Sequence, residues 1–500
     1  MRKLHILLLM GLFLHISSCE QLLDIEEEGQ ITGNVLSDTE SIEKALTGAY
    51  YNLGGTNDGG AGGELFGGDF ILIPTLFAHL PGQEYIWTSS QATDYLVFTE
   101  RNGNPNVKII ANNARVQANW VRAYETLNQV NSILTNLQNI SDANDRNRIE
   151  GECLAIRGML YFEMVRLWGP DYQIGSNVPA IPLILDPFTE IADIQTPTLA
   201  TVAAVYNQVE LDLEEASSLL EPFGKNGSRL NQATCEAYLA RLSLHKQDFS
   251  AAYDHADKVI SSNLYSLMPE PYLVFNNVNN STEDIFAIQQ SLNNNSGDRT
   301  SGTGIVSFMS SLTASGIGQF AIIASALNND FLLNSPIFNI GDRRAGFITS
   351  ADASTTTSDL GPALLYNNIA NNDASILSSA KYTSAANVIP VVRLAELYLT
   401  RAEAVYQTSG VTQAVIDDLN TIRSRAGIPT VDLADFAGNP TAFMDSVKLE
   451  KKREFIYEGQ LLHDLRRWQD LIGNQFQRED PLDNEFLFDI PQSERDTWTN

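Results

Sequence analysis

The sequence is poor in cysteine and histidine, with 3 cysteines and 6 histidines among its 500 residues. After position 19 only Cys153 and Cys235 remain, so the chain cannot carry a disulfide framework. No cysteine pair or Cys/His cluster has the spacing of a zinc site. Both thiols fall in helical patterns, and we expect them to be buried between packed helices. A bridge or a reactive thiol is the alternative.

The motifs of common catalytic sites are missing as well. The chain has no HExxH, no GxSxG, no Walker loop and no EF-hand spacing. Its 61 Asp and Glu residues could include the carboxylate pair of a glycosidase, but no pattern singles one out. We therefore predict a protein that is not an enzyme and that needs no cofactor.

A long, strongly apolar run is also missing from the body of the chain. Residues 300–329 carry no charge, and Ile305–Leu327 is moderately apolar. That stretch contains five serines and two glycines, which disfavour insertion into a membrane. We interpret it as a buried or groove-lining part of a globular domain.

Basic residues are few, since 32 Lys and Arg against 61 Asp and Glu give a net charge of −29. Removal of Arg2 and Lys3 with an N-terminal signal would take the charge to −31. Such a surface repels phosphate backbones and polyanionic glycans, so nucleic acid is excluded as a partner. Neutral and cationic ligands remain open.

The N-terminus has the pattern of a secretion signal. Two basic residues precede a short apolar run, Leu4–Ile16, well below the roughly 20 residues that span a bilayer. The run ends in Ile16-Ser17-Ser18-Cys19, which is typical of a bacterial lipoprotein processing site. We predict a signal peptide at 1–18 and lipid attachment at Cys19, with an ordinary secretory peptide as the alternative.

Most of the chain shows helical periodicity. Apolar residues recur at intervals of three and four along Trp120, Ala123, Leu127, Val130, Leu134 and Leu137; along Ile149, Cys153, Ile156, Leu160, Met164 and Leu167; and along Val202, Val205, Val209, Ala216 and Leu219. Gly169-Pro170 should end the second of these helices. The two prolines in 178–184 require an extended chain there.

Two helical pairs resemble tetratricopeptide units. Ala240 and Ala252 are twelve residues apart, as are Ala402 and Ala414, and such spacing lets antiparallel helices approach closely across a short turn. Units of this kind cannot bury their apolar faces alone and must stack. The sequence therefore predicts a mostly α fold built on a scaffold of helical pairs.

Two regions are less regular. Residues 54–106 begin with many glycines and continue with Tyr85, Trp87 and Tyr95, while residues 266–386 are rich in Asn, Ser, Thr and Gly. Loop-rich blocks between helical pairs suggest insertions where binding surface is built.

A dense run of alternating charge occupies 450–468. Its composition suits ion pairs and backbone caps between packed helices. Metal binding by His463 and Asp464 is the alternative.

The same run resembles the signature of the SusD/RagB family, in Arg453–Gly459 followed by Asp464–Trp468. Further segments resemble the family in the same order: Leu23–Ile25, Ala45–Tyr50, Trp120–Tyr124 with Asn131, Arg157–Phe162, Val165–Gly169, Arg393–Leu399 with Ala402–Ala404, Leu419-Asn420 with Ile422-Arg423, and Ile490–Glu494. The proline common after the first Leu-Asp-Ile is absent, and Leu461 stands where an Arg often follows the Glu-Gly pair. Both departures fall at sites that look structural.

The resemblance implies one SusD-like domain over 19–500. Its tetratricopeptide-like scaffold would cover about 34–265 and 387–475, with an inserted loop-rich variable region at about 266–386 and a further loop block at about 54–106. It also implies a lipid-anchored protein on the cell surface of the outer membrane, acting as a lid over a TonB-dependent SusC-like transporter. Family ligands are usually oligosaccharides or polysaccharides and sometimes peptides.

The resemblance also places the ligand on an aromatic surface in the irregular regions, because sugar faces stack on aromatic rings. The candidate ligand contacts are Tyr85, Trp87, Tyr95, Tyr272 and Phe275, with Asp69 and Arg299 as polar partners. Trp87 is the one tryptophan in a predicted binding loop, and the central insert has none. We expect a neutral glycan ligand, with a peptide as the alternative. A purely structural surface lipoprotein is the third possibility.

Overall fold

The computed structural model describes residues 35–54, 64–79, 85–87, 114–188, 197–221, 227–293, 295, 304–309, 320–323, 342–344, 365–368, 373–469 and 487–498. This described part is mostly helical, which confirms the predicted fold class. Its α-helices are α2 (Thr39–Gly54), α3 (Asp69–His79), α4 (Ala114–Leu134), α5 (Ala143–Trp168), α6 (Tyr172–Gly175), α7 (Val202–Leu219), α8 (Gln232–Lys246), α9 (Phe249–Ser261), α10 (Gly304–Met309), α12 (Leu394–Ser409), α13 (Gln413–Arg425), α14 (Thr441–Glu454), α15 (Leu461–Arg467) and α16 (Gln492–Trp498).

Strands are short and form three sheets. They are β1 (Tyr85–Trp87), β2 (Pro179–Pro182), β3 (Leu199–Thr201), β4 (Asp284–Ile288), β5 (Phe320–Ile323), β6 (Leu365–Asn368), β7 (Asp373–Ser379) and β8 (Ile389–Arg393). The sheet orders are β1-β5-β7-β6, β2-β3 and β4-β8, and every pairing is antiparallel. Strand β2 falls in the segment that two prolines were expected to hold extended.

The three periodic stretches form α4, α5 and α7, as their apolar spacing predicted. Helix α5 begins after Asp142, whose side chain accepts hydrogen bonds from the amides of Asn144 and Asp145. It ends at Trp168, directly before the Gly-Pro pair. Helices α5 and α7 pack so closely that a Cβ on Gly158 would lie 3.0 Å from Leu213 Cγ. The glycine therefore permits the contact.

The helical pairs are also present, since α8 packs on α9, α9 on α12, and α12 on α13. Ala240, Ala252 and Ala402 are fully buried, as the close-packing argument requires. Ala414 is exposed, which corrects its predicted place in a helix interface. The next two residues, Val415 and Ile416, are buried instead, because each step along a helix turns the side chain by about 100°.

Helix α3 lies within 54–106, the block that the sequence predicted to be rich in loops. Asp69 begins the helix, and the apolar run Phe70–Ile73 that follows it is buried. The helix was not predicted because it is short and follows a glycine-rich stretch. The predicted domain boundaries themselves stay predictions.

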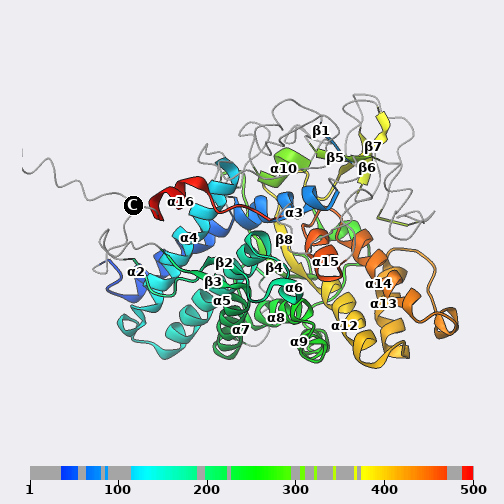
Figure 1. Ribbon diagram of the computed structural model, residues 1–500, viewed down its shortest axis with the longest axis horizontal. Helices are drawn as coiled ribbons and strands as arrows, with labels where there is room; N and C mark the ends of the chain where they lie inside the picture. The colour runs from blue at the N-terminus through cyan, green and yellow to red at the C-terminus, as the bar shows by residue number, and fades with distance from the viewer. Residues whose placement is uncertain are drawn as a thin grey trace, which may run out of the picture.

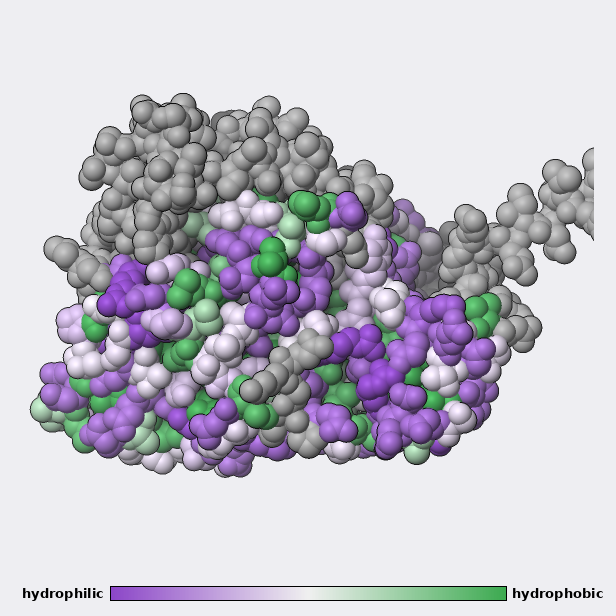
Figure 2. All heavy atoms as spheres, turned by 180° about the vertical axis from the view of Figure 1, so that it is seen from behind, coloured by the Kyte–Doolittle hydropathy of each residue, from purple (hydrophilic) through white to green (hydrophobic). Residues whose placement is uncertain are grey.

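The helical pairs form one side of the molecule, and the sheet of β1, β5, β6 and β7 lies beyond α3 and α10 on the other side (Figure 1). From behind, polar and apolar residues are mixed over the helical body (Figure 2). Within the described chain, no helix is long and apolar enough to cross a membrane.

Both internal cysteines are free and buried, as expected. Burial raises the pKa of the Cys153 and Cys235 thiols above the usual range. Neither thiol therefore has the thiolate character that a reactive site needs.

Candidate functional site

Strand β1 joins the first irregular region to the central insert. Its Trp87 lies opposite Phe320 of β5, and Tyr85 lies opposite Ile322. Strand β5 pairs with β7, and β7 pairs with β6. The first irregular region thus supplies an edge strand to a sheet whose other three strands come from the insert. Two segments that are remote in sequence therefore form one sheet.

The predicted site residues do not all lie together. Tyr85 and Trp87 lie together in β1, while Tyr272 is half-buried in a short 3₁₀ helix, Pro271–Val274, that packs against the core. Tyr95, Arg299 and the lipid-attachment candidate Cys19 lie outside the described residues. The grouping of Tyr272 with the tyrosine and tryptophan of β1 stays a prediction.

Asp69 is an internal ion-pair partner, not an exposed polar group. It is 0% exposed, its carboxylate accepts a hydrogen bond from Arg115 Nε, and its second oxygen accepts one from Asn119 Nδ2 at 2.6 Å. Arg115 also donates to Glu64 at 2.9 Å. Burial, reinforced by the charge of Asp69, raises the pKa of Glu64 well above its usual range. A ligand could contact Asp69 only if this cluster opened, which corrects its expected role.

Phe275 is likewise interior. Its ring is 4% exposed and meets the ring of Tyr382 edge-on at 6.0 Å between centroids. Lys381 Nζ lies 4.7 Å from the same ring, so the ring takes part in a cation–π contact. The sequence-based expectation that Phe275 faces a ligand is therefore not supported by its position.

Lys381, which contacts the Phe275 ring, belongs to a buried network of charges centred on Glu454 and Glu458. Arg393 donates to Glu454 at 2.7 Å and to the two oxygens of Glu458 at 2.9 and 3.0 Å. Glu454 also accepts from Arg425, and Lys381 donates to Glu458 at 2.5 Å. These contacts confirm that the charges at 450–468 form ion pairs between packed elements.

The same network shifts the pKa values of Lys381 and Glu454. Burial lowers the pKa of Lys381 to about 8, although Glu458 opposes the shift. Burial alone would raise the pKa of Glu454, but the charges of Arg425 and Arg393 hold it below its usual range. Glu454 is thus kept ionised inside the protein by the guanidinium groups around it.

The insert supplies parts of this network that the sequence did not lead us to expect. Arg344 donates to Asp342, Glu450 and Glu454, and Glu283 accepts from Arg393 and Arg425. One signal was available, because Arg343 and Arg344 are the only basic residues between Arg299 and Lys381. A basic pair alone in a long stretch without other basic residues indicates a specific acidic partner.

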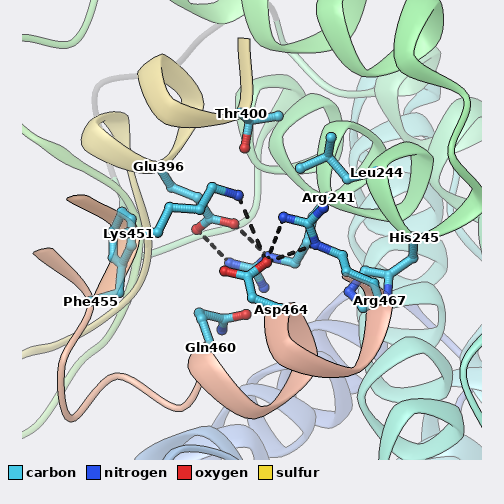
Figure 3. Close-up of a pocket in the computed structure, with 10 residues that line it drawn as sticks. All are labelled: Arg241, Leu244, His245, Glu396, Thr400, Lys451, Phe455, Gln460, Asp464 and Arg467. Atoms are coloured by element: carbon cyan, nitrogen blue, oxygen red, sulfur yellow. Dashed lines mark hydrogen bonds and ion pairs between the residues drawn. The ribbon is translucent and has the colours of Figure 1, made fainter. Parts of the chain in front are cut away.

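A small pocket, partly open to solvent, lies where α8, α12, α14 and α15 meet (Figure 3). It is lined by Arg241, Leu244, His245, Glu396, Thr400, Lys451, Phe455, Gln460, Asp464 and Arg467. Arg241 and Glu396 point toward one another and form two hydrogen bonds of 2.7 Å. Arg467 donates to Asp464 at 2.7 Å. It also donates to Glu403, which does not line the pocket, at 2.5 and 2.7 Å. Because its charges are paired with one another, the pocket is an ion-pair junction of the scaffold.

The positions of His463 and Asp464 do not support the alternative that they bind a metal ion. Asp464 is held by Arg467 and lies 3.7 Å from Lys451 Nζ. Burial, with the charges of nearby arginines, lowers the pKa of His463 well below its usual range. Among the residues with described positions, no three His, Cys, Asp or Glu side chains are grouped as metal ligands.

Comparisons with known proteins agree with this architecture. A family model described as the SusD family matches residues 282–499. A second, described as starch-binding associating with outer membrane, matches residues 83–244. Through these two matches, most of the chain resembles SusD-like proteins. The SusD match includes Arg393, Glu454 and Glu458.

Known SusD-like proteins are similar over most of their length. The chain is 23% identical to SusD-like protein P2 of Formosa agariphila over 400 residues, which is 73% of each chain. A SusD superfamily structure from Bacteroides thetaiotaomicron superposes with a TM-score of 0.69 at 20% identity, covering 92% of this chain and 98% of that one. A SusD-like carbohydrate binding protein from Bacteroides vulgatus gives 0.66 at 19% identity, covering 93% and 97%. At these identities the structural likeness establishes the fold.

Proposed function

We propose that this SusD-like protein is a lipid-anchored protein of the outer-membrane surface that captures a neutral glycan. It would deliver the oligosaccharide or polysaccharide to a TonB-dependent SusC-like transporter. Its role would be binding and not catalysis. The observation that carries the proposal is the pairing of β1 with β5, which joins Trp87 to the sheet of the insert.

The family comparisons support a glycan as the ligand. One matching family is described as starch-binding and associated with the outer membrane, and one similar structure is called a carbohydrate binding protein. The net charge of −29 favours neutral glycans over polyanionic ones, because like charges repel.

The geometry of β1 supports Tyr85 and Trp87 as contacts. Alternate residues of a strand belong to the same face, so positions 85 and 87 share one face of the sheet. Two aromatic residues on one face at an edge strand suit stacking on a sugar ring. Tyr272, half-buried in the insert, is the proposed third contact.

Isothermal titration with starch-type oligosaccharides, other neutral glycans and peptides tests the proposal. Trp87→Ala should weaken glycan binding by about 1–3 kcal/mol, roughly 5- to 150-fold, on the scale known for bases stacked on aromatic rings. Tyr253→Ala is the matched control, because Tyr253 is a 38% exposed aromatic on α9 of the scaffold.

Salt separates the two ligand classes. Affinity for a neutral glycan should hardly change with ionic strength, whereas a cationic peptide attracted by the acidic surface should bind less tightly in salt. Glycan binding that is indifferent to Trp87, or salt-sensitive peptide binding alone, would overturn the proposal.

A further inference from the structure

Residues 342–344 of the insert are held on the scaffold by contacts of Arg343 and Arg344. Arg343 N donates to the carbonyl of Ala426 at 2.9 Å, just beyond the end of α13. Its guanidinium donates to Glu270, near the start of the insert itself, at 2.6 Å. Gly427, with φ +73°, passes so close that a Cβ there would lie 2.8 Å from Arg343 Nε. The scaffold backbone therefore fits closely against this tripeptide.

Arg344 is the centre of the contact. Its side chain is 0% exposed and donates to both oxygens of Asp342, at 2.9 and 2.7 Å. It also donates to Glu450 at 3.0 Å and to Glu454 at 3.3 Å, both on α14. A guanidinium keeps its charge in proteins, so burying it is costly unless acceptors such as carboxylates compensate the charge. The charge thus restricts this part of the insert to one place on the scaffold.

The insert is also held toward its two ends by the same network. Glu283, just before β4, accepts from Arg393 and Arg425 at 2.7 and 2.6 Å. Lys381, just after β7, donates to Glu458 and to the carbonyl of Glu454 at 3.0 Å. Residues 342–344 lie between these two attachments in sequence and on the same network in space.

We infer that Asp342–Arg344 is an internal anchor that divides the insert into two separately tethered segments, and that Arg344 is a positioning residue for the sheet. Strand β5 belongs to the segment before the anchor, and β6 and β7 belong to the segment after it. A segment that is fixed at both ends has fewer conformations when it is short, so two short tethered segments are more restricted than one long one. The anchor thereby holds β5 and β7 in the register that receives β1. Its consequence for ligand binding rests on the proposed function.

Hydrogen exchange on the full chain tests the anchor without any ligand. Arg344→Met should speed amide exchange in 320–323 and 365–379 by roughly tenfold or more while α5 and α7 keep their protection. Arg157→Met is the matched control, because Arg157 is also buried and pairs with both oxygens of Asp212 at 2.8 and 2.7 Å. That control should speed exchange in α5 and α7 and leave the sheet unchanged.

Unchanged exchange of the sheet in Arg344→Met, or equal acceleration in sheet and scaffold, would overturn the anchor. If Arg344→Met does not fold, Arg344→Lys keeps the charge but loses the fork-shaped donor set, and the same comparison decides the question. In glycan titrations, Arg344→Met should weaken binding and Arg157→Met should not. Absence of glycan binding by the wild-type protein would refute the proposed function alone, since the exchange result does not depend on it.

Discussion

At the scale of single residues, buried charge explains the signature segment. Glu454 is almost fully buried and accepts from Arg344, Arg393 and Arg425. Folding removes each guanidinium from water, which costs free energy. The carboxylate of Glu454 offsets that desolvation cost only while it is present. The segment therefore depends on complete pairing more than on any single ion pair.

Removing one acid should expose this dependence. Glu454→Gln keeps the shape of the side chain but leaves buried guanidinium charge uncompensated, so the free energy of unfolding should fall by about 3–5 kcal/mol. Urea denaturation measures the change. Glu40→Gln is the control, because its pair with Lys44 is exposed at the surface, and its stability should equal that of the wild type. Wild-type stability of Glu454→Gln would contradict the network's structural role.

His245 should make stability depend on pH. Burial, aided by the charge of Arg166, lowers its pKa from 6.5 to about 4, although Asp171 opposes the shift. Between these values the unfolded chain binds a proton that the folded chain does not. The free energy of unfolding should therefore decrease as pH falls from about 6.5 to about 4, by roughly 3 kcal/mol in total.

The matched variant is His245→Asn, which keeps an N–H beside Asp171 but does not titrate. Denaturation curves at several pH values should show a shallower pH dependence for this variant than for the wild type. The nearby His463, whose pKa is also lowered, should retain part of the slope. Identical slopes would show that His245 does not titrate in this way.

At the scale of elements, a glycine decides how α15 meets α3. Gly459 has φ +79°, and a Cβ there would lie 2.8 Å from Ile71 Cα and 2.9 Å from the Phe70 carbonyl oxygen. Its amide donates to Thr75 Oγ1 at 3.1 Å. The glycine allows the segment after α14 to lie directly on α3, which in turn contacts α10 of the insert.

Gly459→Ala should therefore be costly for two reasons. A left-handed backbone conformation disfavours alanine, and the methyl group would overlap backbone atoms that cannot rotate away, so we expect a loss of roughly 2–4 kcal/mol. Gly410→Ala isolates the first reason, because Gly410 has φ +72° and nothing within 4 Å of its Cβ position. Thermal denaturation should rank wild type above Gly410→Ala and Gly410→Ala above Gly459→Ala. Equal losses in the two variants would exclude the close approach as a cause.

Secondary structure followed sequence wherever a pattern was local. Helices α4, α5 and α7 were predicted because apolar spacing of three and four is a property of consecutive residues. Helix α3 was missed because a short apolar helix between glycine-rich stretches has too few turns to show a period. Ala414 was misplaced because spacing alone does not give the rotation of a helix about its axis.

At the scale of the whole molecule, the proposed location depends on the N-terminus. Cys19→Ala should release the protein from the membrane fraction of cells that lack the transporter, because acyl chains on this cysteine would be its anchor. Fractionation and immunoblotting measure the distribution. Ser18→Ala is the control and should stay membrane-bound, since a small residue is kept before the cysteine. A Cys19→Ala protein that remains tightly bound would refute lipid anchoring.

By itself, the sequence determined helices α4, α5 and α7, the extended proline segment, the burial of both thiols and the resemblance to the SusD family. Each of these depends on neighbouring residues or on ordered motifs. Only the tertiary structure decided that β1 pairs with β5, that Asp69 and Phe275 are interior, and that Arg344 binds Glu450, 106 positions away. The physical reason is that ion pairs and strand pairings carry no period along the chain. With 61 acids and 32 bases, nearly any pairing was compatible with composition until the fold placed them.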